Sequence, residues 1–216
     1  MDKEFLKEYS CIIGCDEVGR GPIAGPVNAC AVKIIDTKTV DQLLKFDVTD
    51  SKKLSLKKRK VILDQLQIDV SKIQLNKKYI IKNPTLYFEF CVTQLDADEI
   101  DKINILQASL AAMKNASDRL VSKDSKILID GNKTFQSKVI TEAIVKGDSK
   151  CVSIGLASII AKVFRDEKMI IFDQEFPGYM LAKNAGYPTK EHKDAVKRLG
   201  PCLIHRKTFK GVKEYI

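Results

Sequence analysis

The chain has 216 residues, of which 44% are hydrophobic and 30% are charged, so it has enough apolar material for a core and is not a disordered chain. This length excludes a multidomain machine, and we expect one principal domain with a small appendage at most. The 37 basic residues outnumber the 28 acidic ones, and the resulting net charge of +9 fits an acidic polymer as the partner.

The N-terminal quarter predicts two strands followed by a helix. An apolar run at residues 11–15 and a β-branched run at 27–35 are typical of strands, and a glycine-rich turn at 19–22 separates them. Ser55 then begins an amphipathic helical pattern as its cap, with apolar residues on one face and basic residues on the other. The outer face of this helix is expected to be strongly positive.

The central and following segments continue to mix strands and helices. Residues 85–92 read as a strand, and one long helical pattern opens at Asp98 and continues through Met113. Short strands are predicted at 126–130 and 139–145. A helix over 153–172 carries small residues on one face, which would let it lie close against a sheet.

The C-terminal end differs in composition from the rest. Residues 183–213 hold nine basic and two acidic side chains and fit short basic helices around two prolines. Because strands and helices intermix before this segment, we predict an α/β fold with a central mixed β-sheet flanked by helices. We assign residues 1–182 to this domain and 183–216 to a basic helical C-terminal extension packed on it.

Cysteine usage and hydropathy bear on the compartment. None of the six cysteines belongs to a Cys-x-x-Cys pair, and several lie in apolar runs, as reduced thiols of a core do. The first residues alternate charges where a signal peptide needs an apolar segment, and no uncharged run is long enough to cross a bilayer. We therefore expect a cytoplasmic protein with no membrane partner.

Four acidic residues fall at the ends or edges of predicted strands, beside glycines that would open the backbone to a ligand. They are Asp16, Glu17, Asp130 and Asp148. Carboxylates that cluster at strand ends repel one another unless a cation joins them. Hard divalent ions such as Mg²⁺ or Mn²⁺ prefer oxygen ligands, and a pair of them can activate water for phosphodiester hydrolysis. Each acid taken singly also fits a solvated turn, so their convergence stays open at this point.

A Gly19-Arg20-Gly21 turn follows the first two acids. Its glycines would let backbone N–H groups approach a phosphate or a sugar, although the same residues suit an ordinary tight turn. The two histidines, His192 and His205, lie among basic residues and are expected at the surface, which disfavours a zinc site or a Ser-His-Asp triad. The sequence has no Walker loop and no strand-linked Gly-x-Gly-x-x-Gly, which argues against nucleoside triphosphate hydrolysis and dinucleotide binding.

The segment Asp16-Glu17-Val18-Gly19-Arg20-Gly21-Pro22 resembles the signature of the type 2 ribonucleases H, the RNase HII family. The resemblance covers nearly the whole chain, from about residue 10 to 210. Its further blocks follow in the family order at 50–54, 103–108, 129–132, 146–148, 157–163, 165–166, 186–189, 200–201 and 205–206. Several ordered motifs together are far more specific than any one of them. The related RNase HIII group is disfavoured, because it lacks the Gly-Arg-Gly form and usually carries an added N-terminal domain.

The resemblance implies an RNase H-like fold and a metal-dependent endonuclease. Its substrates would be the RNA strand of RNA/DNA hybrids and ribonucleotides embedded in duplex DNA, cut on their 5′ side to leave 3′-hydroxyl and 5′-phosphate ends. Two Mg²⁺ or Mn²⁺ ions would be held by the catalytic carboxylates Asp16, Glu17, Asp130 and Asp148. The substrate-binding residues would be Gly19, Arg20, Gly21 and Tyr187 at the ribonucleotide, and Lys52, Lys53 and the basic C-terminal segment along the backbone.

Two other functions stay open. A catalytically silent protein that binds RNA/DNA hybrids would keep the basic surface, but four metal-competent carboxylates facing a phosphate backbone would hinder binding without ions. A nuclease of the same fold that acts on DNA alone, such as a resolvase or an integrase, is disfavoured only through the resemblance. We expect a monomer, and Asp166, a surface partner of Arg165 or a support of the metal site, stays outside the catalytic set.

Overall fold

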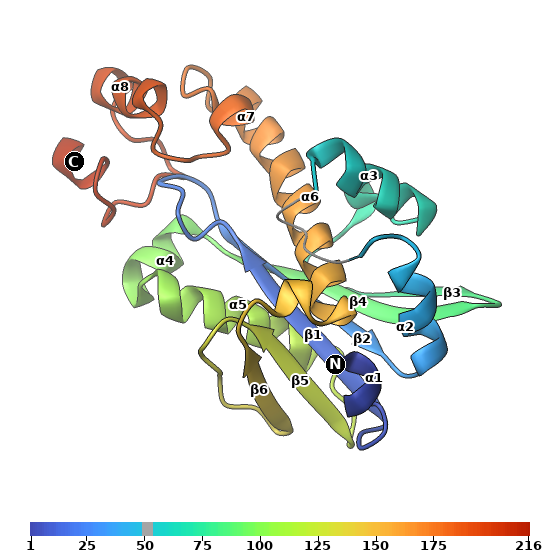
Figure 1. Cartoon of the computed structure of the whole chain (residues 1–216). Helices are drawn as coiled ribbons and strands as arrows, with labels where there is room; N and C mark the ends of the chain where they lie inside the picture. Colours follow the sequence, from blue (N-terminus) through green and yellow to red (C-terminus); the bar gives the residue numbers. More distant parts are fainter. Residues whose placement is uncertain (49–53) are drawn as a thin grey trace.

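The computed structural model describes residues 1–48 and 54–216, which build a six-stranded sheet with helices on both faces (Figure 1). The strands lie in the order β3-β4-β2-β1-β5-β6. An antiparallel group comprises β1 (Cys11–Val18), β2 (Val27–Ile34), β3 (Lys78–Asn83) and β4 (Leu86–Leu95). The strands β5 (Ser125–Asp130) and β6 (Ile140–Ile144) continue the sheet parallel to β1. This mixed sheet confirms the predicted α/β class.

Helices cover both faces of the sheet. On one face, α6 (Val152–Glu175) runs along β1 and β2, and α2 (Thr37–Leu44) and α3 (Leu56–Gln65) contact it. On the other face, α5 (Ile105–Asp118) packs on β2 and β4, and α4 (Ala97–Ile103) precedes it. The remaining described helical elements are α1 (Asp2–Phe5), α7 (Leu181–Asn184), α8 (Lys190–Leu199) and the 3₁₀ turns η2 (Val70–Lys72), η3 (Gly147–Ser149) and η4 (Lys213–Tyr215).

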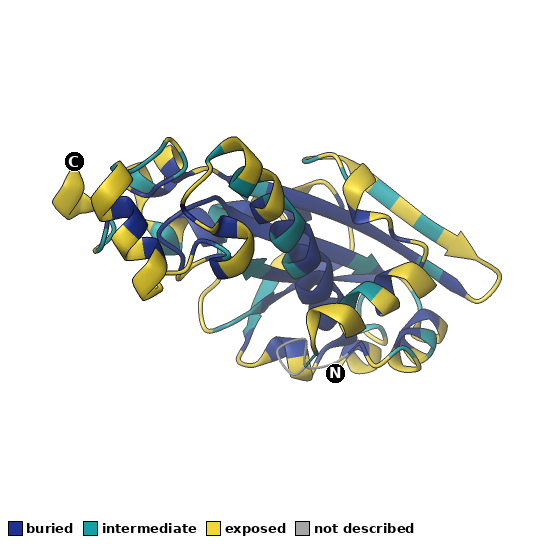
Figure 2. Ribbon diagram, turned by 90° about the horizontal axis from the view of Figure 1, so that it is seen from above, coloured by how far each residue is buried: buried dark blue, intermediate teal, exposed yellow. Residues whose placement is uncertain are grey.

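Alternation of side chains along the strands divides the core into two layers. Ile12 of β1 belongs to the layer beneath α6 and Ile13 to the layer beneath α5, and both are fully buried. The start of α6 lies directly on β1, where a Cβ added to Gly14 would stand 2.4 Å from the backbone nitrogen of Ile154. Only glycine permits this approach. Figure 2 shows the result, in which the N-terminal half of α6 and the central strands are buried within an exposed outer rim.

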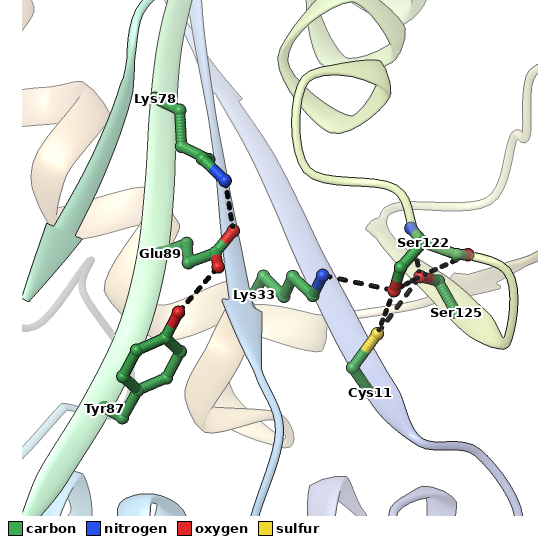
Figure 3. A network of polar contacts seen from close by, with 7 residues as sticks. All are labelled: Cys11, Lys33, Lys78, Tyr87, Glu89, Ser122 and Ser125. Carbon is green, nitrogen blue, oxygen red and sulfur yellow. Dashed lines mark hydrogen bonds and ion pairs between the residues drawn. The ribbon is translucent and has the colours of Figure 1, made fainter.

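Polar contacts also join neighbouring strands to one another and to the loop before β5 (Figure 3). Glu89 of β4 pairs with Lys78 of β3 at 3.5 Å. Lys33 of β2 donates a hydrogen bond to the Ser122 hydroxyl at 3.1 Å, and the sulfur of Cys11 lies 3.2 Å from the same hydroxyl. These contacts tie the start of β1 and the end of β2 to the loop before β5. Cys11 is unpaired with any other cysteine and buried, as four further cysteines are, while Cys202 is half-buried.

Local signals account for some boundaries and mislead at others. Ser55 caps α3 as predicted, because its hydroxyl accepts the N–H of Lys58. The single helix predicted from Asp98 onward is wrong, because Asn104 has φ of 65° and separates α4 from α5. Its side chain accepts the N–H groups of Leu106 and Gln107, and so caps the start of α5. The edge strand β3 and the helix α2 do not follow from the sequence patterns.

The C-terminal segment folds onto the end of α6 that lies beyond the sheet. A third hydrophobic cluster there combines Ile23 and Met169 with Tyr179 and Val196. A β-bridge also joins Ala24 to His205, so residues far apart in sequence share one structural unit. The domain boundary at residue 182 stays a prediction. Among the described helices, none has the length and apolar character that a membrane span requires.

Candidate active site

The four predicted acids lie on segments that follow one another across the sheet. Asp16 and Glu17 stand near the end of β1, and Asp130 is the last residue of β5. Because Cys15 pairs with Ile129 in the parallel register, Asp130 lies beside Asp16. Asp148 is the central residue of η3, which follows β6. The carboxyl ends of parallel strands share one edge of a sheet, so the topology brings these segments together.

A backbone hydrogen bond ties η3 to the end of β5. The N–H of Gly147 donates to Asp130 Oδ1 at 2.7 Å. A Cβ on Gly147 would stand 3.3 Å from the same oxygen and 2.6 Å from the Ile154 side chain, so there is little space between these elements. This contact fixes the backbone of η3, and with it Asp148, against the edge that carries Asp130.

Burial and neighbouring charges change the pKa values of Asp16 and Glu17. Asp16 is 4% exposed, and burial, together with the neighbouring charges of Glu17 and Asp130, raises its pKa to about 8. Burial also raises the pKa of Glu17, against the opposing effect of Arg20, whose Nη1 lies 3.3 Å from Glu17 Oε1. The carboxylates therefore repel one another, and a bound cation would stabilise their charged forms.

The donor set fits a hard divalent ion. All four side chains offer carboxylate oxygens, which Mg²⁺ and Mn²⁺ prefer. As the side chains stand, no group of three or more His, Cys, Asp or Glu within residues 1–48 and 54–216 has the geometry of a formed metal centre. The carboxylates turn to other partners instead, since Asp130 accepts the N–H of Gly147 and Glu17 contacts Arg20. Rotation of these side chains would free their oxygens for a cation.

A pocket of about 200 Å³ opens beside Glu17 and Asp130, between the sheet edge and α5. Arg20 and Lys133 also line it, so the acids face a cavity that contains positive charge. A larger pocket of about 470 Å³ lies between α3 and α6. Its lining residues include none of the four acids, so its size does not make it a candidate for the catalytic centre.

The predicted ribonucleotide-binding residues come together next to the acids. Gly19 has φ of 95°, a left-handed conformation that favours glycine, and the following Arg20 and Gly21 are exposed. A Cβ on Gly21 would stand 3.2 Å from the Tyr187 ring, so the loop and this ring lie against each other. Tyr187 is 47% exposed, which leaves its outer face open to a ligand. Lys52 and Lys53 lie outside the described residues.

The expectation that both histidines lie at the surface is wrong. His192 and His205 are fully buried, and their Nε2 atoms lie 3.1 Å apart. His192 Nδ1 is 2.9 Å from the carbonyl oxygen of Tyr187, so the pair supports the backbone of the predicted ligand-binding tyrosine. Asp166 lies 4.0 Å from Arg59 of α3, and this contact links α3 to α6.

Sequence reasoning also missed two buried arginines. Arg165 and Arg206 are 1% and 0% exposed, and both donate to backbone carbonyls of the segment from Gly19 to Pro26. Burial lowers the pKa of Arg165 to about 10 and that of Arg206 to about 9. Both belong to blocks that resemble the family, at 165–166 and 205–206, and this membership is the signal that could have drawn attention to them.

Residues 13–212 match the family model described as "Ribonuclease HII". The "Ribonuclease HII" of Geotalea uraniireducens (strain Rf4) is 43% identical over 96% of this chain and 86% of its own length. The "PCNA:RNase HII complex from Archaeoglobus fulgidus" contains a similar fold, with a TM-score of 0.71, 21% identity and coverage of 94% of this chain and 96% of that one. "Bst-RNase HIII in complex with Mn2+" aligns with a TM-score of 0.69 and 19% identity over all of this chain and 71% of that one.

Proposed function

Because the chain belongs to the ribonuclease HII family and is thus a divalent-metal-dependent endoribonuclease that degrades RNA in RNA/DNA hybrids, we propose that it also cuts on the 5′ side of single ribonucleotides embedded in duplex DNA. The observation that carries the proposal is the placement of the Gly19–Gly21 loop and Tyr187 against each other beside the acidic edge. A ribonucleotide held there would present its phosphodiester to the carboxylates. The products would be a 3′-hydroxyl and a 5′-phosphate.

We assign the metal-binding role to the four carboxylates Asp16, Glu17, Asp130 and Asp148. Mg²⁺ or Mn²⁺ ions bound there would supply an activated water and stabilise the leaving oxygen. The chain's own part is to gather the oxygen donors at one sheet edge, through the parallel pairing of β1 with β5 and the tie between Gly147 and Asp130. Bst-RNase HIII, which has a similar fold, forms a complex with Mn²⁺, and this supports the choice of an oxygen-preferring ion.

We assign recognition of the ribonucleotide to the Gly19–Gly21 loop and Tyr187. Arg20 and Gly21 are exposed, so their backbone N–H groups can donate to a 2′-hydroxyl or a phosphate, and the Tyr187 ring can contact the sugar. The 2′-hydroxyl is the group that distinguishes RNA from DNA. Lys52, Lys53 and the basic residues of 183–213 are proposed to contact the duplex backbone, so binding should weaken steeply as salt rises.

The test is cleavage of an end-labelled DNA duplex that contains one ribonucleotide, with Mg²⁺ or Mn²⁺ present. We expect the native protein to cut 5′ of the ribonucleotide and Asp130→Asn to lose at least about a hundredfold in rate. Asp118→Asn is the matched control, because Asp118 pairs with Lys114 on the surface of α5. Cleavage of a long hybrid without cleavage of this duplex would refute the proposed single-ribonucleotide activity.

A catalytically silent hybrid-binding protein would give a different result. Removal of divalent ions with EDTA would leave its affinity for a hybrid unchanged or improved, because it needs no metal ions to bind. The family assignment favours the enzyme, for which EDTA should abolish cleavage. The expected monomer and the cytoplasmic location stay predictions.

A further inference from the structure

Arg206 holds the loop that carries the proposed ribonucleotide contacts. Its guanidinium donates to the carbonyl oxygens of Gly19 at 2.5 Å, Arg20 at 3.0 Å, Pro22 at 2.8 Å and Gly25 at 3.0 Å. The side chain is fully buried. Four backbone carbonyls accept its hydrogen bonds, and its guanidinium carbon lies 5.1 Å from the centroid of the Phe209 ring.

These contacts fix the direction of the intervening peptide groups. In a trans peptide the carbonyl and the N–H point to opposite sides, and the described residues contain no cis peptide. Because the carbonyl of Gly19 points inward to Arg206, the N–H of Arg20 points outward. The carbonyl of Arg20 likewise turns the N–H of Gly21 outward.

The neighbouring peptide follows the same rule. The carbonyl of Pro22 accepts from Arg206, and the N–H of the same peptide, that of Ile23, donates away from it to Gly186 at 2.8 Å. By contrast, the N–H groups of Arg20 and Gly21 have no acceptor within residues 1–48 and 54–216, and both residues are exposed. The loop therefore presents two adjacent donors to solvent, next to Tyr187.

We propose that Arg206 is a positioning residue for ribonucleotide recognition, which turns the N–H groups of Arg20 and Gly21 toward the 2′-hydroxyl and adjoining phosphate of the substrate. This inference rests on the proposed function. A guanidinium reaches four carbonyls at once because its donors spread in a planar fork. A lysine at this position would keep the charge but hold fewer carbonyls, and the two peptides would be free to turn. Arg165 cannot replace it, because that side chain holds the carbonyls of Ala24, Pro26 and Ala185.

The test measures preference for the ribonucleotide by fluorescence anisotropy in Ca²⁺, with gels to verify that strands stay intact. Two labelled DNA duplexes are compared, identical except that one carries a single ribonucleotide. We expect Arg206→Lys to weaken binding of the ribonucleotide duplex about tenfold, the effect of losing one or two hydrogen bonds, while binding of the all-DNA duplex changes less than about twofold. Arg119→Lys, at an exposed position after α5, is the matched control and should change neither affinity.

Three negative results are distinguishable. If the native protein binds both duplexes equally, the proposed recognition fails, and this inference fails with it. If the native protein prefers the ribonucleotide and Arg206→Lys keeps that preference, the role of Arg206 is refuted while the proposed function stands. A merely structural role would weaken both duplexes together, and that result also refutes the inference.

A second measurement covers the case in which Arg206→Lys does not fold, as judged by urea unfolding. In ¹⁵N-labelled native protein, the amide resonances of Arg20 and Gly21 should shift on addition of the ribonucleotide duplex and stay in place with the all-DNA duplex. The guanidinium protons of Arg206 should exchange slowly with water, because the side chain is fully buried and donates to four carbonyl oxygens. Unshifted amides, or fast exchange at Arg206, would overturn the inference.

Discussion

Replacement of Asp2 by alanine should destabilise the protein by about 3 kcal/mol, although the residue belongs to a short N-terminal helix. Asp2 is 2% exposed, and its carboxylate accepts the N–H of Val152 at 2.8 Å and the N–H of Ser153 at 3.1 Å. It also accepts the Ser153 hydroxyl at 2.6 Å. Asp2 therefore caps the first turn of α6, the helix that lies on β1.

The magnitude follows from these three contacts. Loss of a carboxylate cap at a helix N-terminus costs about 1–2 kcal/mol. The Ser153 hydroxyl is buried, and leaving it without a partner adds about 1–2 kcal/mol. In a domain of this length each kcal/mol lowers Tm by about 2–4 °C, so Tm should fall by about 6–12 °C.

Urea unfolding followed by circular dichroism measures the loss directly. Asp2→Asn keeps an acceptor oxygen without the charge, so its free energy of unfolding should lie between those of the native protein and Asp2→Ala. Asp41→Ala is the matched control, because Asp41 is 52% exposed and pairs with Lys3 at the surface, and it should lose less than about 1 kcal/mol. Equal losses in Asp2→Ala and Asp41→Ala would refute the assignment of Asp2 as the cap of α6.

Gly19→Ala should lower the free energy of unfolding, measured in urea, by about 2 kcal/mol or more, because alanine is strained at φ of 95° and its Cβ would stand 2.8 Å from Arg165 Nε. Gly200→Ala, with φ of 75° and open space around the position, should lower it by about 1 kcal/mol. Equal losses in the two variants would contradict the packing argument. Burial lowers the pKa of His205 to about 4 and lowers that of His192, so the unfolded chain binds protons that the folded chain does not. The stability that neutral His205 contributes should be complete above about pH 6.5 and fall by about 3 kcal/mol toward pH 4. Because the raised pKa of Asp16 changes stability in the opposite direction over this range, the measurement is the difference in unfolding free energy between the native protein and His205→Gln, and a difference that does not change with pH would contradict the prediction. EDTA should abolish cleavage and added Mg²⁺ or Mn²⁺ should restore it, whereas cleavage that persists in EDTA would argue against the metal-dependent mechanism.

The elements that could be predicted are those with strong local signals. The apolar runs that form β1, β2 and β5 are buried strands in the structure, and the small-residue pattern beginning at 153 belongs to the helix packed on β1. Asn104 could not be recognised as a helix boundary, because the apolar spacing continues across it while its backbone turns to a positive φ. The strand β3 was not predicted, because it lies at the sheet edge, where its side chains are largely exposed and its sequence needs no apolar pattern.

The sequence by itself determined the α/β class, the family and the four acidic positions, because short-range periodicity and ordered motifs are local properties of the chain. Only the tertiary structure decided which groups meet. The parallel register placed Asp130 beside Asp16, and folding buried His205 and Arg206 although their neighbours are basic. Arg206 is stable inside the protein because carbonyls up to 187 positions away accept its hydrogen bonds, and no local pattern encodes partners at that separation.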